Sequence, residues 1–163
     1  FLMLLVPVAL ARLGVKWTMV IGLAALVVRY IAFWCGSLYD QVPLYYMAIL
    51  VHGIIFGFFF VGGQVYVDKK APPEIRAQAQ GFLFLVTFSI GWLAGNFFNV
   101  KLIDIYTTQQ TIAGRMTKVY NWNMVWLVTM AISLVLLVAF FLFFRDDIRR
   151  VSVGTEAEAV SDG

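Results

Sequence analysis

Charged residues and cysteines are scarce in this chain of 163 residues. Charged residues make up 13% of it, against about 25% in an ordinary soluble domain, and hydrophobic residues make up 62%. The hydrophobic residues fall into several internal blocks separated by charged segments. This pattern excludes a water-soluble domain, and a single secretory signal would not produce it. The one cysteine, Cys35, excludes an internal disulfide.

The residue patterns of catalysis and cofactor binding are also lacking. None of the hydrophobic blocks contains a pair of carboxylates, no Cys and His spacing fits a metal ion, and no glycine-rich loop fits a phosphate. The single histidine, His52, has no evident acidic partner. We therefore expect no enzyme, no metal and no cofactor. The net charge of +3 does not indicate nucleic-acid binding, because the basic residues lie at the ends of the hydrophobic blocks.

Four hydrophobic blocks are each long enough to cross a bilayer, which takes about 20 helical residues. Because lipid cannot satisfy backbone polar groups, each block is predicted to be a helix. The fold class is therefore all-α, a polytopic transmembrane helical bundle. We place the spans at residues 17–35, 44–67, 75–100 (or 77–100) and 122–144, with a polar loop at 101–121.

The predicted organisation has three parts. Residues 1–11 are too short to span and are interpreted as the end of a truncated transmembrane helix, so we expect the C-terminal part of a longer protein. Residues 12–147 hold the four spans, with short turns at 12–16 and 36–43. Residues 148–163 are small and acidic, and we expect them to form a disordered cytoplasmic tail.

Lysine and arginine are unevenly divided between the two ends of the spans. The end that carries the 101–121 loop has three, namely Lys101, Arg115 and Lys118. The opposite end has eight, namely Arg12, Lys16, Lys69, Lys70, Arg76, Arg145, Arg149 and Arg150. The excess predicts that this second end is cytoplasmic. We therefore expect a multi-pass protein of the cytoplasmic (inner) membrane with its C-terminus inside, and Trp122 and Trp126 near the outer interface.

Two ionisable side chains, Arg29 and His52, are predicted to lie inside neighbouring spans at similar depth, because a short turn joins the spans. A charged arginine in lipid is costly unless it faces protein or water. Arg29 is then either a substrate or gating contact, or it snorkels or bonds carbonyl groups of a neighbouring helix. His52 is either a substrate or proton-linked contact, or a neutral histidine that an adjacent helix satisfies.

Further candidates lie along the second and third spans. Phe56 is one turn after His52 on the same helix face, where it could stack on a planar ligand. The pairs Gly53–Gly57 and Gly91–Gly95 have the spacing that lets two helices pack closely. Candidates for lining a cavity are Gln64, Thr87, Ser89, Asn96 and Asn99.

Two sets of motifs resemble a known family. The segment Arg12-x-Gly14-x-Lys16 resembles the loop signature of the major facilitator superfamily, with Ala11 where an acid is usual and Pro7 where a glycine is usual. A longer part of the chain is similar to the nucleoside:proton symporter family of that superfamily. The matching motifs are His52-Gly53, Phe58-Phe59-Phe60, Gly63-Gln64-Val65-Tyr66-Val67-Asp68-Lys69-Lys70-Ala71-Pro72 and Glu74-Ile75-Arg76-Ala77-Gln78-Ala79-Gln80-Gly81.

The resemblance covers residues 1–147 and implies the C-terminal half of a twelve-helix carrier, from the end of helix eight to helix twelve. It implies nucleoside import by alternating access, with lipid and a missing N-terminal half as partners. Substrate binding would then involve Phe56, at the family's aromatic position, and His52, where some members have a tyrosine. Arg29 is a third candidate for substrate binding, because it is predicted to lie at a depth similar to that of His52. A cytoplasmic gate would involve Arg12, Gly14, Lys16, Asp68 and Arg76.

One position departs from the family pattern. Gly57 stands where an aspartate is common, which removes a carboxylate that could bond a ribose or base. If proton coupling is retained, its carrier is His52 or a residue of the missing half. Alternatives are an uncoupled facilitator or a carrier of another solute, such as a sugar, amino acid or drug. A further alternative is a non-transporting membrane receptor or assembly subunit.

Overall fold

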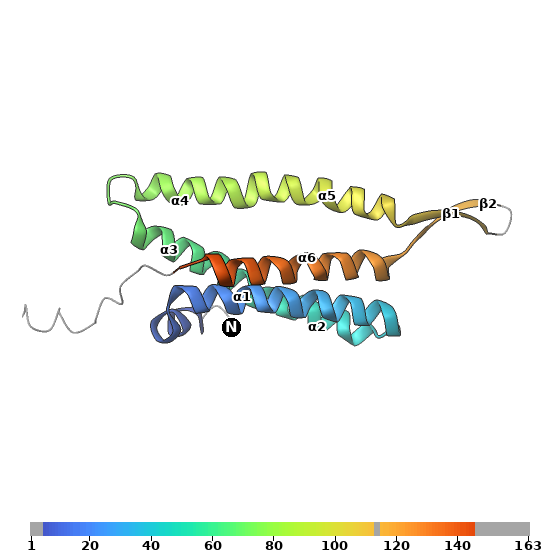
Figure 1. Cartoon of the computed structure of the whole chain (residues 1–163), viewed down its shortest axis with the longest axis horizontal. Coiled ribbons are helices and arrows are strands. Elements are labelled where there is room, and N and C mark those ends of the chain that lie inside the picture. The colour runs from blue at the N-terminus through green and yellow to red at the C-terminus, as the bar shows by residue number, and fades with distance from the viewer. Residues whose placement is uncertain (1–4, 113–114, 146–163) are drawn as a thin grey trace, which may run out of the picture.

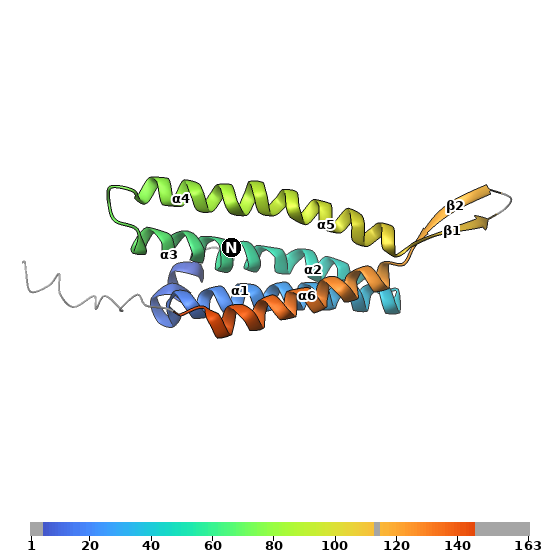
Figure 2. The same cartoon turned by 45° about the horizontal axis from the view of Figure 1, so that its top comes forward.

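The computed structural model describes residues 5–112 and 115–145, and within these ranges four helical spans are long and apolar enough to cross a membrane. They run side by side along the long axis of the molecule (Figures 1 and 2). The first span is α1 (Leu5–Tyr39) and the last is α6 (Trp122–Phe143). The two between them are Val42–Lys70 and Arg76–Ile105. The predicted all-α transmembrane bundle is confirmed.

Each of the two middle spans changes its helix type near its centre. The second consists of α2 (Val42–Ile55), the π-helical segment η2 (Phe56–Val61) and α3 (Gly62–Lys70). The third consists of α4 (Arg76–Phe84), the π-helical segment η3 (Leu85–Ile90) and α5 (Gly91–Ile105). Such π-helical turns are rare and lie frequently at functional sites. Neither segment was predicted from the sequence.

The first span differs from the prediction at both of its ends. The turn expected at 12–16 is a break inside α1, where Gly14 has φ 81° and ψ 174°. A positive φ is strained for any residue with a Cβ, so glycine at this position allows the chain to bend. The turn expected at 36–43 is shorter than predicted: α1 continues to Tyr39, and Asp40 and Gln41 alone join it to α2.

The structure differs most from the prediction in residues 101–121, where a polar loop was expected. Its first residues extend α5 as far as Ile105, and the rest form a hairpin of two antiparallel strands, β1 (Thr107–Ile112) and β2 (Arg115–Tyr120). The hairpin projects beyond the ends of the helices (Figure 1). β-Branched threonine, valine and isoleucine side chains favour an extended backbone here, outside the segments that lipid forces into helices.

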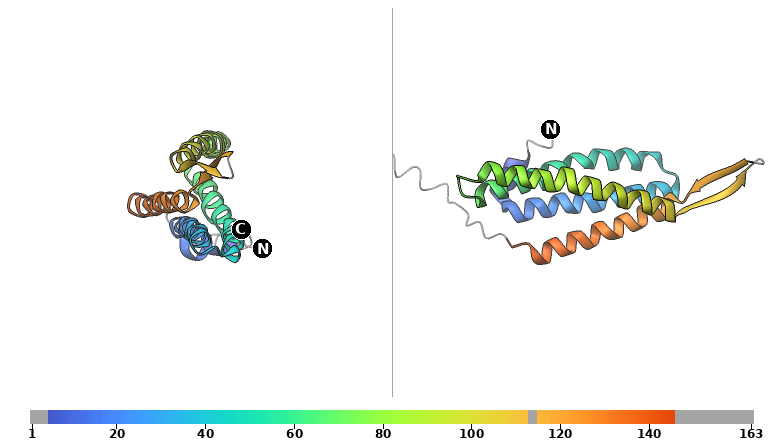
Figure 3. Two further views of the ribbon diagram at one scale, coloured as in Figure 1. Left: turned by 90° about the vertical axis from the view of Figure 1, so that its right-hand side faces the viewer. Right: turned by 90° about the horizontal axis from the view of Figure 1, so that it is seen from above.

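The tightest packing involves α1, which contacts α2, η2 and α6. Its buried face includes Val15, Met19 and Leu23, together with the fully buried Thr18, whose hydroxyl donates to the Gly14 carbonyl oxygen at 2.8 Å. The third span is packed differently. In the end-on view of Figure 3, α4 and α5 stand apart from α1, α2 and α6. In the most apolar 18-residue stretch of this span, no residue is buried against other described parts of the chain.

The two ends of the bundle carry different segments. The connection between α3 and α4 and the C-terminal end of α6 lie at one end, and the hairpin lies at the other (Figure 1). The described basic residues of the α3–α4 connection and of the end of α6 are therefore gathered opposite the hairpin, as the charge count predicted. Arg149, Arg150 and the tail expected at 148–163 fall outside the described residues.

The close approach of helices occurs at Gly22, not at the predicted Gly91–Gly95 pair. A Cβ on Gly22 would lie 2.7 Å from the backbone nitrogen of Phe59, whereas a Cβ on Gly95 would meet nothing within 4 Å. The bare glycine surface therefore lets α1 lie directly against η2, where a side chain would force the two apart.

We predict that Gly22→Ala destabilises the full-length protein by about 1–3 kcal/mol, because the added methyl group collides with backbone that cannot move aside cheaply. The measurement is unfolding of the purified protein in detergent. The matched control is Gly95→Ala, which is expected to leave stability unchanged or to raise it by up to about 1 kcal/mol through helix propensity. Equal stability of the two variants would contradict the packing described here.

Candidate functional site

The structure brings Arg29 of α1 and His52 of α2 into contact. Because the two helices are joined by a short turn, the two side chains lie about equally far from it. The Nη1 atom of Arg29 is 3.0 Å from the Nδ1 atom of His52. An arginine side chain has only donors, so Nδ1 is the acceptor, and the His52 ring in this contact is neutral with its proton on Nε2. The Nε2–H group is then left as a donor toward a ligand.

The guanidinium of Arg29 lies over two aromatic rings. Its Cζ atom lies 5.8 Å from the centre of the Tyr30 ring and 5.4 Å from that of Phe33, and Phe33 is itself stacked on Trp126 of α6 at 4.6 Å. Cation–π contacts of this kind are stronger where water is excluded. The Nε atom of Arg29 is buried and has no hydrogen-bond partner within residues 5–112 and 115–145. Arg29 therefore keeps an unused donor beside His52.

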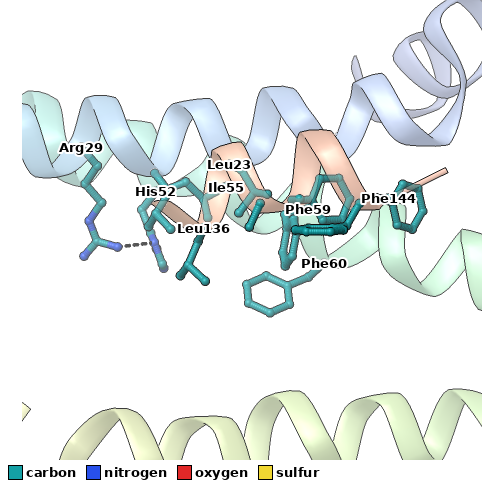
Figure 4. A pocket seen from close by; sticks show the side chains of 12 residues that line it. Leu23, Arg29, His52, Ile55, Phe59, Phe60, Leu136 and Phe144 are labelled. Atoms are coloured by element: carbon teal, nitrogen blue, oxygen red, sulfur yellow. Dashed lines mark hydrogen bonds between the residues drawn. The ribbon is translucent and has the colours of Figure 1, made fainter. Parts of the chain in front are cut away.

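Arg29 and His52 lie at one end of a pocket of about 780 Å³, a volume within the usual range of small-molecule sites. The pocket runs from this polar pair along an apolar wall that α1, α2, η2 and α6 build together, as Figure 4 shows. Apolar residues that line it include Leu23, Ile55, Phe59, Phe60, Leu136 and Phe144. The pocket has the composition of a site for a ligand with one polar edge and an apolar or aromatic face.

Phe56 borders this pocket without lining it. Its ring centre lies 5.4 Å from that of Phe60, which does line the pocket, and 6.1 Å from that of Phe88 on η3. Phe60 and Phe88 are 5.0 Å apart. The two π-helical segments therefore face each other through a cluster of rings formed by Phe56, Phe60 and Phe88. Phe56 is 38% exposed, so part of its ring remains open to a partner.

Of the polar candidates, Gln64 and Thr87 line a smaller pocket of about 150 Å³ next to the ring cluster, together with Phe60. The Thr87 hydroxyl is occupied, since it donates to the Leu83 carbonyl oxygen at 2.7 Å. Ser89, Asn96 and Asn99 are exposed and line neither of these pockets.

α6 contributes aromatic side chains to the large pocket that were not predicted as site residues. Phe140 and Phe144 line the large pocket, and their rings stack on each other at 4.6 Å. Their spacing of four residues was a sign that they share a face, although it does not say which helix that face meets.

The residues predicted to form the gate do not make a single cluster among the described contacts. Asp68, near the end of α3, lies between two side chains of α4: the Nε atom of Arg76 is 3.7 Å from its Oδ1, and the Nε2 of Gln80 donates to the same oxygen at 3.0 Å. Arg12 is exposed, and the Nζ of Lys16 lies 5.3 Å from the ring centre of Phe141. The structure therefore joins α3 to α4 through Asp68 and places Lys16 beside α6.

The contact between Arg29 and His52 leads to a prediction on stability. In a double-mutant cycle of Arg29→Met and His52→Leu, we expect a coupling energy of about 0.6–1.7 kcal/mol, as for other hydrogen bonds between membrane helices. The cycle is measured by unfolding of the full-length protein in detergent. Strictly additive effects of the two substitutions would show that the two side chains do not interact.

Comparison with known proteins places this geometry in a family. The model of the family described as "Nucleoside H+ symporter" matches residues 1–149. The nucleoside permease NupG of Escherichia coli is 32% identical over 157 residues, which are 94% of this chain and 35% of NupG. The putative nucleoside transporter YegT of the same organism is 31% identical over all of this chain and 39% of YegT. The chain thus spans about a third of the length of these curated relatives.

The solved structures agree with the sequence comparison. A crystal structure of the nucleoside transporter NupG superposes with a TM-score of 0.73 over 87% of this chain and 34% of the NupG chain, at 32% identity. The arrangement of the helices is therefore that of part of a major facilitator transporter, as predicted. The chain is a multi-pass membrane protein and belongs to the nucleoside H+ symporter family.

Proposed function

We propose that the full-length protein moves nucleosides across the cytoplasmic membrane by alternating access, coupled to the entry of protons. The observation that carries the proposal is the family match over residues 1–149. It is supported by the names of the relatives, which are a nucleoside permease, a putative nucleoside transporter and a xanthosine permease. As in other transporters of this kind, the substrate would bind near the middle of the membrane, between this part and the N-terminal half.

The described residues supply both kinds of contact that a nucleoside needs. A base has two flat faces, which stack on aromatic rings, and we assign this role to Phe56 in the ring cluster with Phe60 and Phe88. The base carbonyl groups and ribose hydroxyl groups accept hydrogen bonds. Candidate donors in the large pocket, which Phe60 also lines, are the Nε2–H of His52 on the second span and the guanidinium of Arg29 on the first, whose Nε has no hydrogen-bond partner among the described residues.

The same pair offers a physical link between proton and substrate. Gly57 leaves the helix without the carboxylate common in the family, so within the described spans His52 is our candidate proton carrier. A proton arriving at Nδ1 would convert this atom from an acceptor into a donor, and the contact with Arg29 would be lost. Protonation of His52 would thereby free the guanidinium of Arg29 for an acceptor on the substrate.

The cytoplasmic side of the site is assigned to the end of the bundle that carries the connection between α3 and α4. The excess of basic residues at this end supports the assignment. Here the contacts of Asp68 with Arg76 and Gln80 hold the second and third spans together. We assign these contacts to a cytoplasmic gate, formed when the transporter is open to the outside. Arg12, Gly14 and Lys16 of α1 are assigned to the same gate.

One observation favours a second candidate function. Because Gly57 carries no carboxylate, a nucleoside could be moved down its gradient without a proton. The uncoupled facilitator would use the same aromatic cluster and differ only in His52, which would serve as a hydrogen-bond donor and not as a proton carrier.

Stacking on Phe56 is tested by substitution in the full-length protein. We expect Phe56→Ala to raise the KM for uridine uptake by roughly 5- to 150-fold, since stacking of a base on an aromatic side chain contributes about 1–3 kcal/mol. The matched control is Phe97→Ala on α5, where the side chain is 65% exposed and lines neither of the pockets described above. A Phe56→Ala transporter with the KM of the control would remove Phe56 from the binding site.

Proton coupling is tested by uptake of radiolabelled uridine in transport-deficient cells, with and without a protonophore. The symporter proposal predicts that uptake against the gradient collapses with the protonophore.

It also predicts that His52→Gln, which keeps a donor but cannot titrate, moves uridine only down its gradient. Uptake that persists with the protonophore but never exceeds equilibration would support the facilitator, and absence of uridine uptake from a well-expressed protein would contradict nucleoside transport. Normal transport by His52→Ala at every pH tested would exclude the histidine.

A further inference from the structure

A second cavity lies at the opposite end of the bundle from the α3–α4 connection, at the base of the hairpin. Its volume is about 480 Å³, again within the range of small-molecule sites. It forms where the ends of α1 and α5, both strands and the start of α6 meet. It shares none of its lining residues with the pocket of Arg29 and His52. None of the roles assigned above uses it.

The register of the hairpin turns one of its faces toward this cavity. Thr108 pairs with Val119, and because alternate residues of a strand share a face, Gln110 lies on the same side as both. All three line the cavity. Gln109 and its partner Lys118 belong to the opposite face and do not line the cavity. Tyr120, the last residue of β2, departs from this alternation and lines the cavity next to Val119.

The remaining lining is aromatic and uncharged. Tyr106, Tyr120 and Trp122 line the cavity, and the rings of Tyr120 and Trp122 lie 5.7 Å apart with an angle of 31° between them. Its polar side chains carry hydroxyl and amide groups, and no lysine, arginine, aspartate or glutamate of the described ranges contributes to it. The chemistry suits a neutral ligand that has a ring to lie against aromatic side chains and several hydroxyl groups.

The side-chain oxygens of the two asparagines in this lining are bonded differently. The side-chain oxygen of Asn121 accepts from the backbone nitrogen of Met124 at 3.2 Å, and its backbone nitrogen donates to the Tyr106 carbonyl oxygen at 3.0 Å. Asn121 is therefore occupied with capping α6 and tying it to the end of α5. The Oδ1 atom of Asn123, in contrast, is buried and has no hydrogen-bond partner among the described residues. A buried acceptor without a donor is unfavourable, so a rotation of the Asn123 side chain that turns this oxygen into the cavity, where a ligand can donate to it, would remove that cost.

We propose that the cavity at the base of the hairpin is a second binding site, for a neutral ring that carries hydroxyl groups. The ribose of a nucleoside and a free saccharide share this chemistry. A nucleotide is disfavoured, since the lining has no cation to meet its phosphate. If the bundle is oriented as proposed above, this site lies at the outer mouth, where it would capture substrate ahead of the central site. The choice of a nucleoside as a probe rests on the proposed function, whereas the site itself does not.

The test is direct binding of uridine, free ribose and a neutral disaccharide to the purified full-length protein, detected by saturation-transfer NMR. It is carried out in the Phe56→Ala background, which weakens the central site. We expect Asn123→Ala to weaken binding of at least one of these probes by about fivefold or more, through loss of one hydrogen bond. We also expect Asn123→Ala to leave the melting temperature of the ligand-free protein unchanged or higher, because the oxygen that it removes is unpaired. A purely structural asparagine would lower that melting temperature.

The matched control is Gln109→Ala on the opposite face of the hairpin, which is expected to bind like the parent protein. Tyr120→Leu gives a second, independent perturbation of the cavity. Binding of uridine that these variants weaken would support a nucleoside site, and binding of ribose or the disaccharide alone would support a saccharide site. The proposal is overturned if none of the three probes binds, or if both cavity variants bind as the control does. Failure of uridine transport would leave this binding result intact.

Discussion

Inside a bilayer, every polar group must find its partner within the protein, and this requirement governs both the fold and the site. It forces the backbone into helices. It also explains why hydroxyl groups in the spans bond within their own helix. Thr87 and Thr129 each donate to the carbonyl oxygen four residues earlier. Arg29 and His52 are exceptions, since they pair across two helices and no described residue bonds the Nε of Arg29. Polar groups that local bonds do not satisfy are where a membrane transporter can meet its substrate.

The fold could be predicted from the sequence where lipid imposes a single solution. Four blocks of sufficient length gave four helical spans, and Gly14 marked the break in α1. The prediction failed where the chain leaves the membrane. Residues up to Tyr39 and Ile105 are compatible with a helix, so nothing in their composition shows where it ends. The hairpin has polar residues on both faces, and it therefore lacks the alternation of apolar and polar residues that indicates a strand.

The site could be predicted only in part. The short turn between two spans was enough to place Arg29 and His52 at similar depth. The walls of the pocket could not be predicted, because they depend on which faces of distant helices meet. Gly22 packs against the backbone at Phe59, and with Thr18 four residues earlier it forms a pair of small residues of the kind that marks close helix contacts. The Gly91–Gly95 pair has the same spacing and shows no such contact at Gly95, so the spacing alone does not tell which pairs pack closely. The π-helical segments, which turn Phe56 and Phe60 toward Phe88, have no sequence signature that we could use.

The central claim is that a nucleoside occupies the space beside Phe56, and substrate protection of a cysteine tests it most directly. Phe56→Cys is combined with Cys35→Ser in the full-length protein, and the rate of reaction with a membrane-impermeant thiol reagent is measured with and without uridine. Our account predicts that the reagent reacts at position 56 and that uridine slows the reaction, whereas a Phe97→Cys control shows no slowing. A cysteine at position 56 that does not react, or that reacts at the same rate with saturating uridine, would contradict the account.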